Sequence, residues 1–348
     1  MTKKYAILSV ISLSHFIVDT ACIMMVVNLT KIDSPAFIAV FLILLYDLIA
    51  FSTQPIFGYL SDRFNKPTQI AAIGCILTAV GLILYPLPYL AIVVSGIGNA
   101  LFHVGGGVIS LKLDPGKAWA PGIFISTGTM GVFIGTVLGK QAYMPLLLIS
   151  LLVLLAGAHL FMKVPLKELP IRVQSNRTYG KVFSLALFLI LFTVFIRSFT
   201  GMGITYTWKA DIKLAFVMAI CIMLGKALGG ILFDRFGLIK VPMAGLILSV
   251  PCLIIGFTYP LAGFIGMLLF NLTMPVTLLL TTKLFPGYEG LGFGMTVLAL
   301  SIGTVPVFSG LRLTSGFMIA VTILVSALAL FLGDKLINKQ NQNNALEE

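Results

Sequence analysis

Two ionisable residues lie four positions apart near the start of the chain, inside a stretch that is otherwise apolar. If that stretch is helical, His15 and Asp19 share one face. A carboxylate beside an imidazole can bind and release a proton near neutral pH. We therefore predict that this pair handles protons, with a polar contact that only fixes helix packing as the alternative.

A second polar pair lies in the next apolar stretch. Asp47 and Gln54 are seven residues apart, so a regular helix would place them on one face. We predict Asp47 as a further proton site and Gln54 as its polar neighbour. The alternative is that Asp47 pairs with a nearby hydroxyl or arginine.

His103 follows Asn99 by four residues and precedes the glycines 105–107. Glycines at this place can loosen a helix or allow another backbone to approach closely. They do not form a phosphate-binding loop, because no strand precedes them. We predict that His103 contacts a solute or a proton.

Arg197 is the only arginine deep inside an apolar stretch. A guanidinium group is always charged, so it requires an anion, and we consider Asp19, Asp47 or an anionic solute. Pairing with a protonatable aspartate would let solute and proton compete for the same arginine. Lys226, two turns before Asp234, is predicted to extend its amine toward the membrane surface.

The composition indicates what must position these side chains. Hydrophobic residues make up 59% of the 348 residues and charged residues only 10%, whereas a soluble domain carries about 25% charged residues. Stretches of roughly 20 apolar residues have the length of a membrane-spanning helix. Twelve such stretches are predicted, at about 5–29, 35–60, 68–86, 88–111, 120–139, 142–162, 182–204, 212–233, 241–259, 261–282, 291–311 and 314–333.

The longest polar connection divides these twelve spans into two sets of six. We predict a six-helix bundle over 1–163, a cytoplasmic linker over 164–181, and a second bundle over 182–348 that ends in a short cytoplasmic tail. Most Lys and Arg residues fall on one side of the predicted spans, which indicates that both termini are cytoplasmic. The residues on the other side are Lys31, Lys140, Lys209, Lys213 and Arg312.

The two halves repeat a short motif. Gly58-Tyr-Leu-Ser-Asp62-Arg63-Phe64 returns 172 residues later as Gly230-Ile-Leu-Phe-Asp234-Arg235-Phe236, and Leu101-Phe102-His103 has a counterpart in Leu269-Phe270-Asn271. Internal repeats of this kind build many transporter folds. An aspartate at such a position can accept charge-assisted hydrogen bonds from an arginine or a helix N-terminus.

The repeated loop resembles the signature loop of the major facilitator superfamily. The resemblance implies an all-α membrane protein with twelve transmembrane helices in two pseudo-symmetric six-helix bundles. It also implies that the loop residues of both halves take part in gating. These residues are Gly58, Asp62, Arg63, Gly230, Asp234 and Arg235.

Further strings resemble the fosmidomycin-resistance branch of that superfamily, whose members are proton-driven exporters. They are Ser14-His15-Phe16-Ile17-Val18-Asp19, Gln54-Pro55-Ile56-Phe57-Gly58, Gly98-Asn-Ala-Leu-Phe102-His103 and Arg197-Ser198. One departure concerns the residues after His103, where the branch has Pro-Glu and this chain has Val-Gly-Gly-Gly. The missing carboxylate argues against fosmidomycin itself as the substrate.

Small residues in the apolar stretches are predicted to pack helices. Gly128, Gly131, Gly135 and Gly139 follow one another at three- and four-residue spacing, which lets helices approach closely. The resemblance to the glycine-rich motif of superfamily exporters lacks the Gly-Pro of that motif. The four cysteines show no metal-binding spacing and are also interpreted as packing residues.

Together these features predict a proton-coupled secondary transporter of the inner, cytoplasmic membrane. It is expected to export a small organic, anionic solute as a monomer, with no cofactor besides the proton gradient and no nucleic-acid partner. Seven residues are assigned to the proton and solute pathway: His15, Asp19, Asp47, Gln54, His103, Arg197 and Asn271. No metal site is assigned.

Four alternatives stay open. A divalent metal carrier could use His15, Asp19, Asp47 and His103 as ligands, and proton symport could drive uptake of an organic solute. A receptor would need a soluble output domain larger than the linker or the tail. A membrane enzyme is disfavoured because neither a nucleophile elbow nor an HExxH motif occurs.

Overall fold

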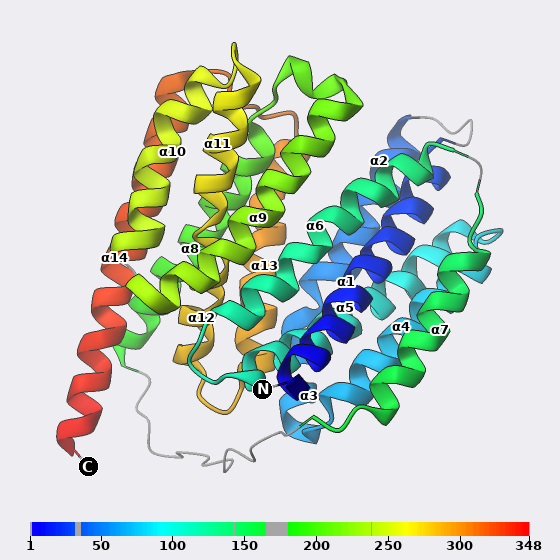
Figure 1. Cartoon of the computed structure of the whole chain (residues 1–348), viewed down its shortest axis with the longest axis horizontal. Helices are drawn as coiled ribbons and strands as arrows, with labels where there is room; N and C mark the ends of the chain where they lie inside the picture. Colours follow the sequence, from blue (N-terminus) through cyan, green and yellow to red (C-terminus); the bar gives the residue numbers. More distant parts are fainter. Residues whose placement is uncertain (1, 32–35, 142, 165–179, 238, 348) are drawn as a thin grey trace.

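The computed structural model describes residues 2–31, 36–141, 143–164, 180–237 and 239–347, which form helices and short connections (Figure 1). No strand occurs within these ranges. Nine helices are long and apolar enough to cross a membrane, and three shorter apolar helices accompany them in the same ranges. The fold prediction of twelve spans is confirmed.

The first six spans come from the N-terminal half. In chain order they are α1 (Thr2–Leu29), the composite α2 (Ala36–Asp47), η1 (Leu48–Ser52) and α3 (Gln54–Phe64), then α4 (Pro67–Ile83), α5 (Pro88–Leu113), α6 (Trp119–Gly139) and α7 (Leu146–Phe161). Proline stands at the first position of α4 and α5, where its missing N–H has no helical partner to lose.

The C-terminal half supplies the other six. They are α8 (Lys181–Gly203), α9 (Ile212–Phe236) after the short η2 (Thr207–Ala210), η3 (Ile239–Met243) with α10 (Ala244–Ile255), α11 (Pro260–Asn271) with α12 (Met274–Leu284), α13 (Glu289–Phe308) and α14 (Gly316–Glu347). The expected span 261–282 is thus two helices, because Leu272 and Thr273 interrupt it.

Each half has its own hydrophobic core. One cluster of buried side chains draws mainly on α1 to α7, and a second draws on α8 to α14. Large apolar side chains such as Phe37, Leu146 and Phe161 point outward, with 72%, 78% and 87% of their surface exposed. An apolar exterior suits lipid, where backbone groups are satisfied inside the helices.

The second span contains a π-helical turn, η1, which the sequence did not predict. A π turn holds more residues than an α turn and so rotates the residues that follow it. Gln54 comes after this turn and is fully buried, whereas Asp47 comes before it and is half-buried. The expectation that these two residues share a face is therefore wrong.

Both ends of the described chain lie at one end of the molecule (Figure 1). Asp62 and Asp234 lie at this same end, in the last turns of α3 and α9. We call it the motif face. The predicted linker 164–181 falls almost entirely on residues outside the described ranges, so the bounds 1–163 and 182–348 stay predictions.

Candidate functional site

Three of the predicted pathway residues meet inside the N-terminal half. His15 and Asp19 lie on α1, and His103 reaches them from α5. Nε2 of His15 is 3.3 Å from Oδ2 of Asp19, and Nε2 of His103 is 3.5 Å from Oδ1 of the same carboxylate. All three side chains are buried. We call these three residues the His–Asp–His cluster.

The other nitrogen of each ring fixes where its hydrogen lies. Nδ1 of His15 is 2.7 Å from the carbonyl oxygen of Phe124, and Nδ1 of His103 is 2.9 Å from the carbonyl oxygen of Asn99. A carbonyl can only accept, so each Nδ1 donates. In the neutral rings both Nε2 atoms then carry lone pairs that face the Asp19 carboxylate. Such facing acceptors require protons or a cation between them.

Two further residues complete the surroundings of Asp19. The side-chain amide of Asn99 donates to Oδ1 of Asp19 at 3.2 Å. Gly128 of α6 lies against the cluster, and a Cβ there would collide with Nε2 of His15 and lie 2.6 Å from Oδ2 of Asp19. The glycine therefore lets the backbone of α6 pack directly against these two atoms.

The glycine stripe of α6 faces α1 along its length. Added Cβ atoms at Gly131 and Gly135 would lie 2.6 Å from the carbonyl of Phe16 and 2.7 Å from that of Thr20. Gly139 lies equally close to α1 one turn further on. The prediction that this stripe packs helices is confirmed.

The glycines after His103 have the same role. A Cβ at Gly105 would lie 2.6 Å from the backbone nitrogen of Ala71 on α4. At Gly107 it would lie 2.5 Å from the ring of Phe293, which belongs to α13 in the other half. Helix α5 runs through these glycines without interruption, so they allow close approach and do not loosen the helix.

Arg197 lies on α8 in the C-terminal half and is 7% exposed. Its Nη2 donates to the carbonyl of Phe270 at 2.9 Å, and its guanidinium carbon lies 4.8 Å from the centroid of the Phe270 ring. Its Nε is buried without a hydrogen-bond partner. Within the described ranges no carboxylate lies within 4.0 Å of it, so the expected pairing with Asp19 or Asp47 is not found.

Lys226 of α9 reaches across to the N-terminal half. Its Nζ donates to Oγ1 of Thr129 on α6 at 2.7 Å. The expectation that this amine extends to the membrane surface is wrong. A hydroxyl carries no charge, and among the residues described here no ion pair includes Lys226.

The remaining pathway candidates lie outside the His–Asp–His cluster. Asn271 is buried at the end of α11, where its amide donates to the carbonyl of Met267 at 2.8 Å. The amide of Gln54 donates to the carbonyl of Ala50 at 2.8 Å, and its Oε1 is buried without a partner. Asp47 is half-buried.

The repeated aspartates join the two halves at the motif face. Oδ1 and Oδ2 of Asp62 accept the backbone N–H groups of Gly290 and Leu291, both at 2.9 Å. Both donors lie at the first turn of α13, where backbone N–H groups lack helical partners. The helix N-terminus also favours a negative charge.

Asp234 makes the equivalent contact in the opposite direction. Its carboxylate accepts the N–H of Ala118 at 2.8 Å and that of Trp119 at 2.9 Å, at the start of α6. We call the two sets of hydrogen bonds the paired latch. Each aspartate thus binds the half to which it does not belong.

The motif glycines make these contacts possible, whereas the motif arginines do not contribute. A Cβ at Gly58 would collide with the carbonyl of Gly290, and one at Gly230 would collide with that of Ala118. Arg63 and Arg235 are exposed and take no part in the paired latch.

Two features of the structure were not predicted from the sequence. His159 of α7 is fully buried and lies 3.0 Å from the Ser14 hydroxyl through Nε2. Its place in an apolar stretch was the signal that could have identified it. The second feature is an ion pair of 3.9 Å between Lys112 and Glu289, which joins the halves beside the paired latch.

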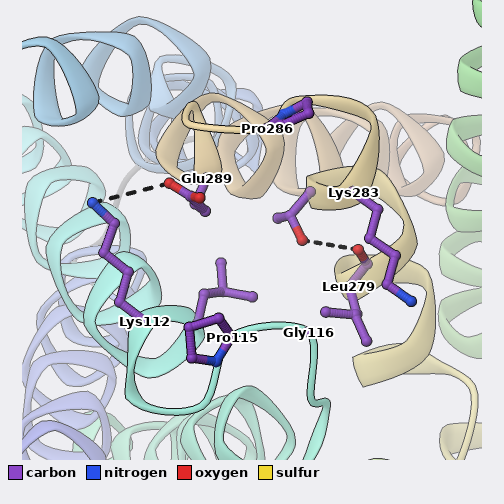
Figure 2. A pocket seen from close by; sticks show the side chains of 9 residues that line it. Lys112, Pro115, Gly116, Leu279, Lys283, Pro286 and Glu289 are labelled. Carbon is purple, nitrogen blue, oxygen red and sulfur yellow. Dashed lines mark hydrogen bonds and ion pairs between the residues drawn. The ribbon is translucent and has the colours of Figure 1, made fainter. Parts of the chain in front are cut away.

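A cavity of about 240 Å³ lies next to this ion pair, and Figure 2 shows that residues of both halves line it. From the N-terminal half come Lys112 of α5 and, in the loop after it, Pro115 and Gly116. From the C-terminal half come Leu279 and Lys283 of α12 and Glu289, the first residue of α13. The cavity is separate from the His–Asp–His cluster, none of whose residues line it.

Comparisons with known proteins find similarity in structure and not in sequence. No protein-family model matches the chain, and no curated protein matches it. A single-residue variant of the E. coli fucose:proton symporter FucP superposes with a TM-score of 0.67 at 14% identity, covering 95% of this chain and 97% of the symporter. The chain has the major facilitator fold.

Two further structures agree on that fold. FucP in the outward conformation gives a TM-score of 0.60 at 15% identity, covering 93% of this chain and 97% of FucP. A bacterial homologue of the iron transporter ferroportin in an outward-facing state gives 0.58 at 16% identity, covering 97% and 99%. In a major facilitator fold, the paired latch joins the two bundles at one membrane face.

Proposed function

We propose that this chain is a secondary active transporter that couples a small organic anion to protons by alternating access. The observation that carries the proposal is that each half buries a charged group whose charge is not balanced by the groups around it. The N-terminal half buries a carboxylate between two imidazole lone pairs. The C-terminal half buries a guanidinium group that has no carboxylate within 4.0 Å in the described ranges.

The anion is assigned to the C-terminal half. Desolvating a charge is costly unless a partner compensates for it, and intramembrane charges therefore mark solute or ion pathways. The Nε donor of Arg197 has no hydrogen-bond partner, and the amine of Lys226 donates to a neutral hydroxyl. An anionic solute would supply the missing charge, while Asn271, next to Phe270, would help to orient it.

The coupling proton is assigned to the N-terminal half. Protons shared between Asp19 and the facing Nε2 atoms of His15 and His103 would remove the repulsion between their lone pairs. Asp47 and Gln54 stay candidates for the proton path beside this cluster. The resemblance to proton-driven exporters supports efflux, with proton symport into the cell as the alternative direction.

The paired latch supports alternating access. It consists of hydrogen bonds to two helix N-termini, so it can open without breaking the core of either half. Rocking of one bundle against the other would then expose the interface from alternate sides. In this proposal Gly58, Asp62, Gly230 and Asp234 form the gate, while Arg63 and Arg235, which take no part in the paired latch, stay candidates.

The excess of Lys and Arg on one side supports a cytoplasmic position for the motif face. Both termini would then be cytoplasmic, in a monomer of the inner membrane. No enzymatic step and no cofactor beyond the proton gradient are assigned. The divalent-metal alternative uses His15, Asp19, Asp47 and His103 as ligands, and a flux assay can include it as an outcome.

The test is flux into proteoliposomes driven by a pH gradient, measured for a panel of small organic anions and cations. Wild type is compared with Asp19→Asn and Arg197→Gln. Asp114→Asn serves as control, because Asp114 contacts Lys4 and Trp119 within the N-terminal half. We expect anion flux that Asp19→Asn uncouples from the gradient and that Arg197→Gln abolishes.

Normal coupled flux in both variants would contradict the assigned site. Flux of divalent metals alone would favour the metal carrier. Gradient-driven flux of cations alone would contradict the assignment of the solute charge to Arg197.

A further inference from the structure

We propose that His15, Asp19 and His103 bind one divalent transition-metal ion through two imidazole nitrogens and the carboxylate of Asp19. One potential ligand atom from each of the three residues lies within 4.8 Å of the other two. The three side chains come from α1 and α5 and are buried. This inference goes beyond solute transport, because it concerns equilibrium binding to the folded protein.

The distances between the atoms fit a metal site. Zinc binds imidazole nitrogen at about 2.0–2.1 Å and carboxylate oxygen at about 2.0–2.2 Å, usually with tetrahedral geometry. Neighbouring ligand atoms around such an ion are therefore roughly 3.3–3.5 Å apart. In the cluster, Nε2 of His15 is 3.3 Å from Oδ2 of Asp19 and Nε2 of His103 is 3.5 Å from Oδ1, so an ion between the two rings would face both oxygens of the carboxylate.

The hydrogen bonds behind these atoms fit as well. Histidines that bind metals usually donate their other ring N–H to a backbone carbonyl or carboxylate, which orients the ring. Both Nδ1 atoms of the cluster donate to backbone carbonyls, those of Phe124 and Asn99. Asn99 also donates its amide to Asp19, which fixes the carboxylate.

The helix packing around the cluster also matters. Gly128 lets the α6 backbone lie directly against His15 Nε2 and Asp19 Oδ2, where any side chain would collide with both atoms and displace them. The side-chain oxygen of Asn99 is buried without a hydrogen-bond partner in the described part of the chain. It can serve as a fourth ligand only if the amide turns its oxygen toward the ion and gives up the hydrogen bond to Asp19, and otherwise water can take that position.

The donor set selects the kind of ion. Imidazole nitrogen suits Zn²⁺, Fe²⁺, Co²⁺ and Ni²⁺, whereas Mg²⁺ and Ca²⁺ prefer sites made of oxygen. A divalent ion also supplies the positive charge that the facing acceptors of His15, Asp19 and His103 require. Metal and protons would exclude each other, because both need the same lone pairs.

The experiment titrates Co²⁺ into purified full-length protein that carries a tag without histidine, and follows the visible absorption of bound Co²⁺. We expect one Co²⁺ per chain and its displacement by Zn²⁺ but not by Mg²⁺. His103→Gln should weaken Co²⁺ binding by at least about 100-fold. Loss of a residue that only hydrogen-bonds to a metal ligand already lowers metal affinity about 10–100-fold.

Two matched controls separate ligand loss from damage to the fold. His159→Gln removes the third histidine of the chain, which is buried outside the cluster, and should leave Co²⁺ affinity unchanged. Gly128→Ala should abolish binding, whereas Gly135→Ala, which crowds α1 two turns away, should retain it. Size-exclusion profiles and thermal unfolding would verify that each variant is folded.

The proposal is overturned if folded wild type binds no Co²⁺ or Zn²⁺, or if His103→Gln binds as tightly as wild type. Binding that His159→Gln abolishes and His103→Gln retains would also overturn it. Because no flux is measured, a failure of transport leaves this result intact. Metal binding without organic-anion flux would contradict the proposed function and not the metal site.

Discussion

The carboxylate of Asp62 accepts the backbone N–H of Gly290 at 2.9 Å, although the two residues belong to different halves of the chain. Asp234 and Ala118 form the equivalent pair at 2.8 Å. Asp234 follows Asp62 by 172 residues, and Gly290 follows Ala118 by the same number. The internal repeat therefore relates the two accepting aspartates to each other, and it also relates the two helix N-termini that they bind.

Replacing Asp62 should open the motif face. Asp62→Ala removes two hydrogen bonds to a charged group, each worth about 1.5–3 kcal/mol. Loss of even one of these bonds, about 1.5–3 kcal/mol, shifts a two-state population by roughly 10- to 150-fold. Spin labels on Lys66→Cys and Lys240→Cys, which are exposed on opposite halves, would report a longer distance by double electron–electron resonance.

The control for this measurement is Asp114→Ala. Asp114 lies between α5 and α6, but its partners Lys4 and Trp119 both belong to the N-terminal half. Its loss should leave the label distance unchanged. An unchanged distance in Asp62→Ala as well would show that the latch does not hold the halves together.

Adding a methyl group to Gly58 should also oppose closure. A Cβ there would collide with the carbonyl of Gly290, so the two helices must separate. We expect Gly58→Ala to lengthen the same label distance. Gly157→Ala is the matched control, because nothing lies within 4 Å of a Cβ on Gly157. It should raise helix stability by about 0.5–1 kcal/mol, measured as a higher unfolding temperature.

Arg197 should not tolerate lysine. The guanidinium group donates to the Phe270 carbonyl and lies against the Phe270 ring, a combination that an ammonium group reproduces poorly. We expect Arg197→Lys to lower anion flux at least about tenfold, and Arg312→Lys, at an exposed site, to leave it unchanged. Equal flux in Arg197→Lys and wild type would show that only the positive charge matters.

Lys226 and Thr129 should have separable roles. Lys226→Met removes a positive charge between the halves, so we expect the KM for an anionic solute to rise. Thr129→Val removes only the neutral acceptor at 2.7 Å and should leave that KM within about twofold. Flux measured against solute concentration tests both. A similar rise in KM in both variants would mean that the transporter needs the Lys226–Thr129 hydrogen bond and not the charge of Lys226.

Much of the fold could be predicted from the sequence because its causes are local. Runs of apolar residues predicted the twelve spans, and the repeated motif predicted which loops would be equivalent. The spacing of His15 and Asp19 predicted their contact, since a helix brings residues four apart together. The π turn before Gln54 shows the limit of this reasoning, because it changes the helical period that the spacing assumes.

Only the tertiary structure decided which distant groups meet. It brought His103 to the far side of the Asp19 carboxylate and gave Arg197 a carbonyl partner where an aspartate was expected. It also directed Lys226 to the other half. Helix periodicity determines which residues share a face, but the neighbour of that face depends on how twelve helices pack, which no single stretch of sequence determines.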